Sequence, residues 1–467
     1  MMRSTETALL TLVTLLTWIG YAMTKLALDV QAQHNPLASL PQAVTLTIVV
    51  VLPFWLIHAL LCWQRIRQSQ LILPLLKLLV VFGLMMLWRL NQSPLIQAIY
   101  QIEADSLFNN QLLRGLYLGA VAMLLLVWQP SLVERVLRNR WSIFVASLGS
   151  LFLLLLAALI GAADGLSVLS FGVLSSVQLT ELLKVALIFV IAWYVDQVGT
   201  SAEISQMRFG FINLPRLQAW LPSITFVAVA SLLFFRLSDL GAILVLLPLF
   251  ITLLYLGVEP KAFQTILWSG MLLAAAAFTL LSRFVSTPLR VLDRWQAFRD
   301  PWSRELSVWY GEPIYLSSGV QLQQAIYGTT AGGFWGQGLG FGQPDIIPAA
   351  ISDFILAAIA EEMGLIVTLA LIMIFLLLLW RIARVAIHLR EDMLFERLLI
   401  VGIAVHLGFQ FLIMAAGTWN LFIMTGITVP FLSQGGVALA VNLAEVGIVL
   451  AIAGRHATSE KSRFYRG

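Results

Sequence analysis

The chain alternates long apolar runs with short polar connections. The runs lie near residues 7–28, 43–63, 71–90, 112–129, 142–162, 178–197, 219–236, 239–257, 264–283, 353–380, 398–417 and 435–454. Each run is close to the ~20 residues that an α-helix needs to cross the hydrocarbon core of a bilayer. The short alternating strands of an outer-membrane barrel do not appear. The pattern predicts an all-α, polytopic membrane protein with about twelve transmembrane helices.

Composition supports this class. Hydrophobic residues make up 60% of the chain and charged residues 11%, whereas soluble domains have about 25% charged residues. The net charge of +4 gives no reason to expect nucleic acid as a partner, because most basic residues lie in short connections between apolar runs. There they report membrane topology.

The basic residues fall in alternate connections. With the N-terminus inside, the inner connections and the tail carry Arg65, Arg67, Arg135, Arg138, Arg140, Arg208, Arg216, Lys261, Arg381, Arg384, Arg390, Arg455, Lys461, Arg463 and Arg466. The outer connections 29–42 and 163–177 have neither Lys nor Arg. This bias predicts an even number of spans with both termini cytoplasmic. The run 7–28 is too long for a signal-peptide core, so we expect a retained first span.

One outer connection, residues 284–352, is much longer than the others. Near its start, Leu289, Leu292 and Trp295 share one helical face, and Arg290 and Arg294 point towards another. This pattern suits a helix in the membrane surface, or an amphipathic helix packed on the protein. Long ordered loops in compact proteins are usually functional.

Several charged residues lie in or beside the apolar runs, where charge is costly. Glu181 and Lys184 are three residues apart and can form an ion pair on one helix. Asp239 stands between two runs and is expected either to cap the second helix or to take part in chemistry. Glu361 and Glu362 point about 100° apart, so at most one faces a given cavity.

The glycines of residues 332–342 permit tight turns and close backbone approach. They either provide loop geometry or expose N–H groups to a diphosphate, although no strand precedes them as a nucleotide fold requires. Cys62 is the only cysteine, and no two of the five histidines have helical spacing. The sequence therefore predicts no disulfide framework and no metal site.

Six stretches, in order, resemble motifs of one family. They are QLTELLK (178–184), SDLG (238–241), GQGLG (336–340), PAAISDFI (348–355), IAEEMG (359–364) and TGITVPFLSQGG (425–436). Together they resemble the SEDS family (shape, elongation, division and sporulation), the FtsW and RodA type of bacterial cell-wall polymerase. Its members have about ten spans. The resemblance implies an N-terminal part, 1–140, with two additional spans, a membrane core at 141–455 that includes the long loop, and a cytoplasmic tail, 456–467.

The resemblance implies a peptidoglycan glycosyltransferase of the bacterial cytoplasmic membrane that serves cell division or cell shape. Its substrate would be lipid II, and its partners a single-span transpeptidase and the bilayer. A carboxylate base, Glu312 or Asp300, would take the proton from the acceptor hydroxyl in an inverting transfer. Cationic groups or a divalent ion (Mg²⁺ or Mn²⁺) would stabilise the departing diphosphate. Further candidates for substrate contacts are Arg290, Arg294, Arg299, Gln321, Asp239, Asp353 and Ser433.

The motifs also depart from the family pattern. Spacing back from Gln321 places Ile314 where the family has its loop aspartate, so Glu312 takes that role only with a two-residue insertion. The outer connection before 178 lacks the family's Arg-Trp, and Gln434 replaces a tyrosine. A second hypothesis therefore stays open: a non-catalytic scaffold, or a protein that binds or translocates a lipid-linked precursor.

Overall fold

The computed structural model divides into two compact units. The structure describes residues 3–33, 40–64, 66, 69–100, 106–130, 139, 145, 149, 152, 179–200, 206–209, 212–215, 226–231, 233–235, 239–257, 289–302 and 317–464. The first unit comprises Met1–Glu134, Arg294–Val385 and Gln410–Gly467, and the second comprises Arg135–Asp293 and Ala386–Phe409. Each unit is considered by itself.

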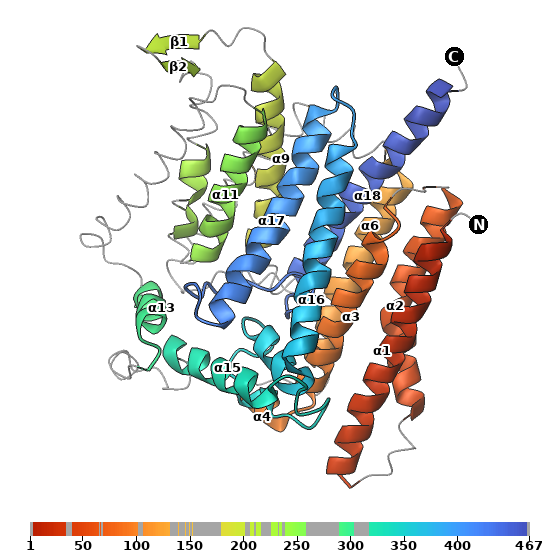
Figure 1. Cartoon of the computed structure of the whole chain (residues 1–467), viewed down its shortest axis with the longest axis vertical. Helices are drawn as coiled ribbons and strands as arrows, with labels where there is room; N and C mark the ends of the chain where they lie inside the picture. Colours follow the sequence, from red (N-terminus) through yellow and green to blue (C-terminus); the bar gives the residue numbers. More distant parts are fainter. Residues whose placement is uncertain are drawn as a thin grey trace. The chain divides into compact units, whose positions relative to one another are not determined.

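The first unit is a bundle of long apolar helices. Its elements are α1 (Ser4–Gln31), α2 (Leu40–Trp63), α3 (Ile72–Asn91), α4 (Pro94–Tyr100), α5 (Ser106–Asn110), the π-helix η2 (Gln111–Tyr117), α6 (Leu118–Trp128), α15 (Ser318–Gly332), the 3₁₀ turn η5 (Pro344–Ile346), α16 (Ile355–Ile387) and α18 (Gly436–Phe464). Helix α1 packs on α2 and α3, and α18 packs along α6 and η2 (Figure 1). Helix α3 is almost entirely buried.

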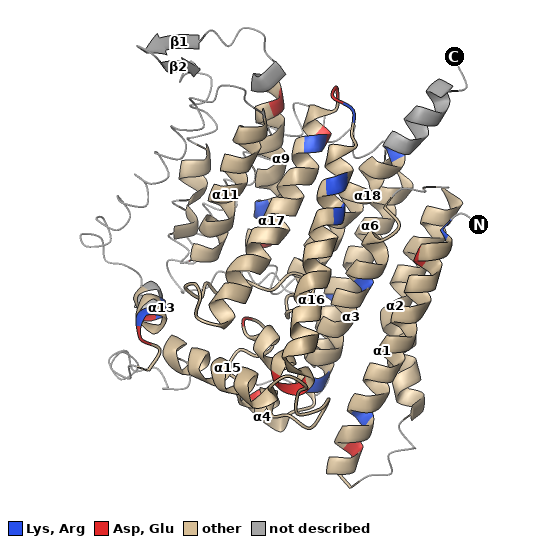
Figure 2. Ribbon diagram, viewed as in Figure 1, with Lys and Arg blue, Asp and Glu red and all other residues tan. Residues whose placement is uncertain are grey.

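The two ends of the first unit differ. The start of α1 and the end of α18 lie at one end, here called the terminal end (Figure 1). Helices α4 and α15 lie at the other, here called the loop end (Figure 1). Charged side chains are sparse along the helices between them (Figure 2), as the cost of burying charge in a bilayer requires.

The described part of the second unit is also mainly helical. Helix α9 (Leu179–Thr200) packs against α11 (Leu240–Gly257). Gly402 lets its helix approach both, because a Cβ there would lie 2.6 Å from Ile188 and 3.6 Å from Leu249. A hairpin that was not predicted joins β1 (Gln206–Phe209) to β2 (Ile212–Pro215) in antiparallel register. Helices α13 (Leu289–Arg299) and α17 (Leu394–Thr418) have residues in both units, as does α16 through its last two residues.

Seven described helices are long and apolar enough to cross a membrane: α1, α2, α3, the continuous helix Ser106–Trp128, α16, α17 and the part of α18 up to Arg455. They match seven of the predicted runs, so the chain is a multi-pass helical membrane protein. Three further runs correspond to α9, the short apolar helix Phe226–Phe235 and α11. The predicted spans 142–162 and 264–283 fall almost wholly outside the described residues.

Helix α16 is broken near its start. Gly364 has φ 82° and ψ 170°, so the helix kinks there. The amides after the kink bond to a neighbouring loop: Leu365 N–H donates to the Gly333 carbonyl at 2.9 Å, and Ile366 N–H to that of Phe334 at 3.3 Å. Irregular backbone at membrane depth needs such replacement partners. The kink thereby ties the glycine-rich loop to α16.

Candidate functional site

The glycine-rich loop, residues 333–343, is held by both glutamates of α16. Glu362 Oε2 accepts the Gly340 N–H at 3.1 Å, and Glu361 Oε1 accepts the Gln343 N–H at 2.9 Å. Arg89 of α3 places its Nε 3.0 Å from Glu362 Oε1 and donates through Nη2 to the Gly342 carbonyl at 3.1 Å. Glu362 and Arg89 are both buried. The two glutamates therefore anchor one loop from different sides of the helix.

The loop amides are also used within the protein. Gln337 N–H donates to the Glu361 carbonyl and Gly338 N–H to the Glu362 carbonyl, both at 2.9 Å. Gly336 N–H donates to the Gly332 carbonyl at 2.8 Å, and the Gly340 amide is bonded to Glu362. Since these amides have internal partners, a diphosphate cradle in this loop is contradicted. The glycines serve loop geometry: a Cβ on Gly336 would lie 2.3 Å from the Glu362 carbonyl oxygen.

A second cluster of polar side chains lies at the loop end and contains three of the predicted site residues. Arg294, from α13, donates through Nη1 to the Thr425 carbonyl at 2.7 Å. Gly426, with φ 76°, allows this approach, because a Cβ there would lie 2.5 Å from Arg294 Nη2. The positive charge of Arg294 lies close enough to Asp353 to lower the pKa of its carboxyl group. Ser433 Oγ donates a hydrogen bond to the carbonyl of Ser352 at 2.6 Å. We call Arg294, Asp353 and Ser433 the Arg294 cluster.

Asp353 is the carboxylate of this cluster. Its burial raises the pKa to about 6, while the Arg294 charge and a hydrogen bond with Ser352 partly oppose that rise. A carboxyl group with such a pKa is mostly ionised at neutral pH and is a stronger base than an ordinary aspartate. The cluster therefore presents a base and a cation close together.

The loop that carries Ser433 is fixed by two glutamines that were not singled out from the sequence. Gln111, in η2, donates to the Ser433 carbonyl at 3.1 Å and accepts the Gly435 N–H at 2.8 Å. Gln410, in α17, donates to the Thr428 carbonyl at 2.9 Å. The stretch 425–435 is thus pinned by side chains of two helices. An isolated glutamine in an apolar run is the signal that was available for them.

The other predicted site residues of the long outer connection lie outside the Arg294 cluster as defined above. Asp300 follows α13, is exposed, and accepts the Trp302 N–H at 3.0 Å. Arg299 is exposed at the end of α13, and Gln321 is half-buried in the first turn of α15. Arg290 lies in α13, and Glu312 lies outside the described residues. The base role of Glu312 and Asp300 therefore stays a prediction.

The second unit holds the predicted ion pair and the predicted cap. Lys184 Nζ lies 2.8 Å from Glu181 Oε1, and both side chains are buried in α9. Asp239 accepts the Ala242 N–H through Oδ1 at 2.9 Å, which caps the start of α11. The helix-capping interpretation of Asp239 is thus confirmed.

Two buried groups join α1 and α2 to each other and to α3. Lys77 of α3 donates to the Leu10 carbonyl at 2.9 Å and to Thr14 Oγ1 at 2.5 Å, and lies 5.5 Å from the centre of the Trp55 ring. At the terminal end, Glu6 binds both Arg3 and His58, the latter at 2.5 Å.

Among the described residues, no group of three His, Cys, Asp or Glu side chains could hold a metal ion. The Arg294 cluster offers one carboxylate with a cation beside it. A protein-held Mg²⁺ or Mn²⁺ needs several oxygen ligands. The described residues of this cluster do not fit a resident divalent ion.

These features define a class: a polytopic helical membrane protein with a kinked helix that anchors a glycine-rich loop, and a polar cluster at the same end. A family model described as "Cell cycle protein", for FtsW, RodA and SpoVE, matches residues 69–458. The chain belongs to this family. Helices α1 and α2 precede the matched region.

Curated relatives are consistent with membership of this family. The chain is 34% identical over 288 residues to the peptidoglycan glycosyltransferase RodA of Mycobacterium tuberculosis, covering 60% of this chain and 55% of the relative. It is 32% identical over 280 residues to a probable peptidoglycan glycosyltransferase FtsW of a Geobacter species, covering 60% and 68%. The chain thus spans little more than half the length of the mycobacterial relative.

Two solved structures share the fold. A chain from a peptidoglycan synthase complex has a TM-score of 0.58 at 22% identity, covering 82% of this chain and 97% of that chain. RodA of Thermus thermophilus has a TM-score of 0.53 at 21% identity, covering 82% and 96%.

Proposed function

We propose that this protein is a peptidoglycan glycosyltransferase that polymerises a lipid-linked disaccharide-peptide, lipid II, into glycan strands for cell division or cell shape. Family membership and the names of the relatives support this reaction class. The structural observation that carries the proposal is the Arg294 cluster. It holds a carboxylate with a pKa of about 6 next to an arginine, the two kinds of group that glycosyl transfer from a diphosphate requires.

In this proposal a carboxylate takes the proton from the attacking sugar hydroxyl while the bond between the donor sugar and the diphosphate breaks. Arg294 stabilises the departing diphosphate, because its guanidinium is a planar, permanently charged donor. Asp353 is the carboxylate that the geometry favours as base. Asp300 and Glu312 stay in the proposal as the bases that the sequence favours. A divalent ion would enter with the diphosphate, since Mg²⁺ commonly binds through substrate phosphates.

We place the protein in the bacterial cytoplasmic membrane with both termini inside and the loop end outside. Two observations support this orientation. Both ends of the described chain lie at the terminal end (Figure 1). The guanidinium carbons of Arg381 and Arg384 lie 4.7 and 5.3 Å from the Trp380 ring centre, as suits an inner membrane interface. A single-span transpeptidase is the proposed partner, because a structural relative belongs to a complex of polymerisation and crosslinking.

The test is polymerisation of lipid II by the full chain in liposomes, with and without a single-span transpeptidase, read as glycan polymer on a gel. Asp353→Asn, Asp300→Asn and Glu312→Gln are compared at equal expression and equal thermal stability. We expect polymer from the wild type, none from Asp353→Asn and normal amounts from Asp300→Asn. Loss of polymer in Glu312→Gln alone would move the base to the outer loop.

The departures from the family motifs favour a second candidate, a scaffold that binds the lipid-linked precursor without polymerising it. The same assay separates the two. If the chain binds lipid II but yields no polymer under conditions in which a RodA relative is active, the glycosyltransferase proposal fails and the scaffold is supported.

A further inference from the structure

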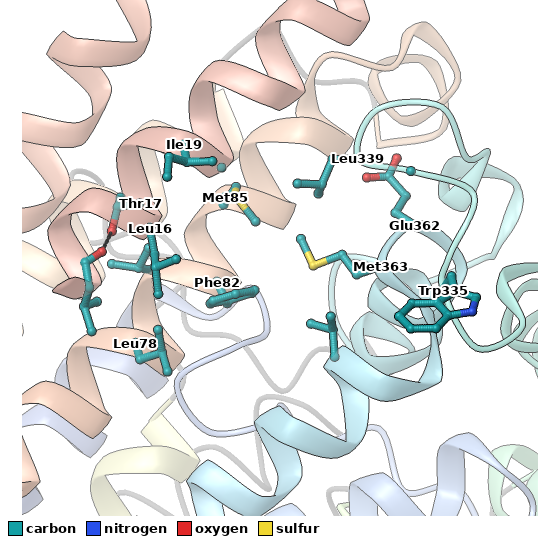
Figure 3. A pocket seen from close by; sticks show the side chains of 15 residues that line it. Leu16, Thr17, Ile19, Leu78, Phe82, Met85, Trp335, Leu339, Glu362 and Met363 are labelled. Carbon is teal, nitrogen blue, oxygen red and sulfur yellow. Dashed lines mark hydrogen bonds between the residues drawn. The ribbon is translucent and has the colours of Figure 1, made fainter. Parts of the chain in front are cut away.

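An apolar pocket lies in the first unit between α1, α3 and the start of α16. Its volume is about 330 Å³, at the lower end of the range for small-ligand sites. Leu16 and Gly20 of α1 line it with Phe82 and Met85 of α3 (Figure 3). Leu339 of the glycine-rich loop and Met363 of α16 close the opposite side (Figure 3). One wall is therefore α1, which precedes the family match.

Apart from the indole of Trp335, which is 84% exposed, the polar side chains in the lining are Thr17 and Glu362, and both are already bonded. Thr17 Oγ1 donates to the Val13 carbonyl at 2.6 Å. Glu362 uses one carboxylate oxygen for Arg89 and the other for the Gly340 amide. A water molecule needs two to four polar partners to be held in a cavity. The pocket therefore suits an occupant without hydrogen-bonding groups.

The pocket reaches the protein surface through apolar side chains. Leu16 is 46% exposed and Trp335, at the loop-end rim, is 84% exposed. An exposed aliphatic residue on a spanning helix and an exposed tryptophan in a loop at a helix end are both typical of a surface that faces lipid. The molecules that surround such a surface are bilayer lipids. The one carboxylate in the lining gives no attraction to a lipid phosphate, so the pocket selects a chain rather than a headgroup.

We propose that this pocket holds one acyl chain of a bilayer phospholipid, which fills the space between α1 and the glycine-rich loop. The occupant would help to fix the position of the glycine-rich loop, because α1 also contacts that loop directly. Gln31 donates to the Gly340 carbonyl at 3.0 Å. A bound chain would thus complete the contact between α1 and the loop that Glu361 and Glu362 anchor. The proposal involves no glycosyl transfer, so its failure leaves the proposed function untouched.

The test uses the full chain in phospholipid liposomes that contain a small fraction of a phospholipid with a diazirine near the end of one acyl chain. After illumination, labelled peptides are mapped by mass spectrometry. A parallel arm replaces this probe by a photoactivatable polyprenyl phosphate at the same mole fraction. We expect the phospholipid to label the lining residues of α1 and α16 in preference to lipid-facing positions such as Leu369 and Met373, which do not line the pocket.

Matched variants identify the pocket. Leu16→Trp fills its mouth, whereas Leu15→Trp places the same side chain at a neighbouring position that is 54% exposed and outside the lining. We expect Leu16→Trp to lower labelling of the pocket peptides at least about fivefold, because an overfilled site excludes the chain. Leu15→Trp should leave it unchanged. Val367→Phe, from the α16 side, blocks the pocket independently should Leu16→Trp fail to accumulate.

Three results would overturn the proposal. The first is equal labelling of lining and lipid-facing residues in the wild type, which needs no variant. The second is pocket labelling that persists in folded Leu16→Trp and folded Val367→Phe. The third is pocket labelling by the polyprenyl phosphate alone, which would assign the site to a different lipid.

Discussion

The pair between Glu362 and Arg89 makes a quantitative prediction about what stabilises the glycine-rich loop. The perturbations are Arg89→Met, Glu362→Met and the double variant Arg89→Met/Glu362→Met. In the wild type the two side chains are 8% and 0% exposed and 3.0 Å apart. Each charge also binds the loop backbone, through Gly342 and Gly340 respectively.

Each single substitution should cost about 3–5 kcal/mol of unfolding free energy, because it leaves an uncompensated charge in a buried site. The double variant removes both charges. It should then lose only the two hydrogen bonds to the loop, each worth about 1–3 kcal/mol once its backbone partner is left unpaired. The sum of the single effects therefore exceeds the double effect, and at the middle of these ranges the coupling energy is about 4 kcal/mol.

The assay is reversible unfolding in mixed micelles, followed by far-ultraviolet circular dichroism. Hydrogen exchange of the Gly340 amide supplies a local measurement, and it should accelerate in every variant that lacks the Glu362 carboxylate. Arg390 and Asp392 form the control pair, since their side chains are 35% and 61% exposed. Their removal should cost about 0–1 kcal/mol.

Additive effects of the two single substitutions, within about 0.5 kcal/mol, would refute the reasoning. So would an unchanged exchange rate at Gly340 in Glu362→Met. Either result would mean that the glutamate and the arginine do not jointly hold the loop.

Three more predictions concern other charged or strained positions. The pKa of Asp353 in the folded protein is raised from the ordinary value of 3.8 to about 6. The free energy of unfolding should therefore fall by up to about 3 kcal/mol as the pH rises through 4–6. Asp353→Asn should abolish this pH dependence, and a slope of the same size in that variant would refute the prediction. Glu181→Ala and Lys184→Ala should each destabilise the protein with strong non-additivity in the double variant, and simple additivity in a thermal-unfolding series would count against the buried pair. Gly364→Ala should lower the free energy of unfolding by at least about 1–3 kcal/mol, because φ there is 82° and a Cβ would lie 2.4 Å from the Phe334 carbonyl oxygen. An alanine variant as stable as the wild type in the same measurement would show that the kink is not required.

The fold was largely predictable because a bilayer imposes one strong rule, a run of about 20 apolar residues for each span. The run 7–28 became α1 (Ser4–Gln31) and the run 398–417 became α17 (Leu394–Thr418). What the rule cannot supply is a break within a span. The residues around Gly364 continue the apolar pattern. The kink depends instead on backbone partners from Gly333 and Phe334, some thirty residues earlier.

The candidate site was predictable only where the partners are close in sequence. Glu181 and Lys184, and the cap formed by Asp239, follow from local helix geometry. Arg89 was missed as the partner of Glu362, because 273 residues separate them and a lone arginine at the end of an apolar run also reads as an interfacial residue. Ser433 and Asp353 came from motif resemblance. The position of Asp353 near Arg294 and the bond from Ser433 to the Ser352 carbonyl depend on tertiary contacts that no spacing rule encodes.

Helices α1 and α2 precede the family match, yet they do not behave as a separable addition. The three contacts that the structure gives Lys77 of α3 all come from them: the Leu10 carbonyl, the Thr14 hydroxyl and the Trp55 ring. An ammonium group at this depth is costly unless such partners replace its water. At the loop end, Gln31 of α1 reaches Gly340, whose amide binds Glu362. The same helix thus satisfies a buried charge of the family core and contacts the loop that the core's glutamates hold. Its surroundings, including the lipid in the pocket beside it, can therefore influence the position of that loop.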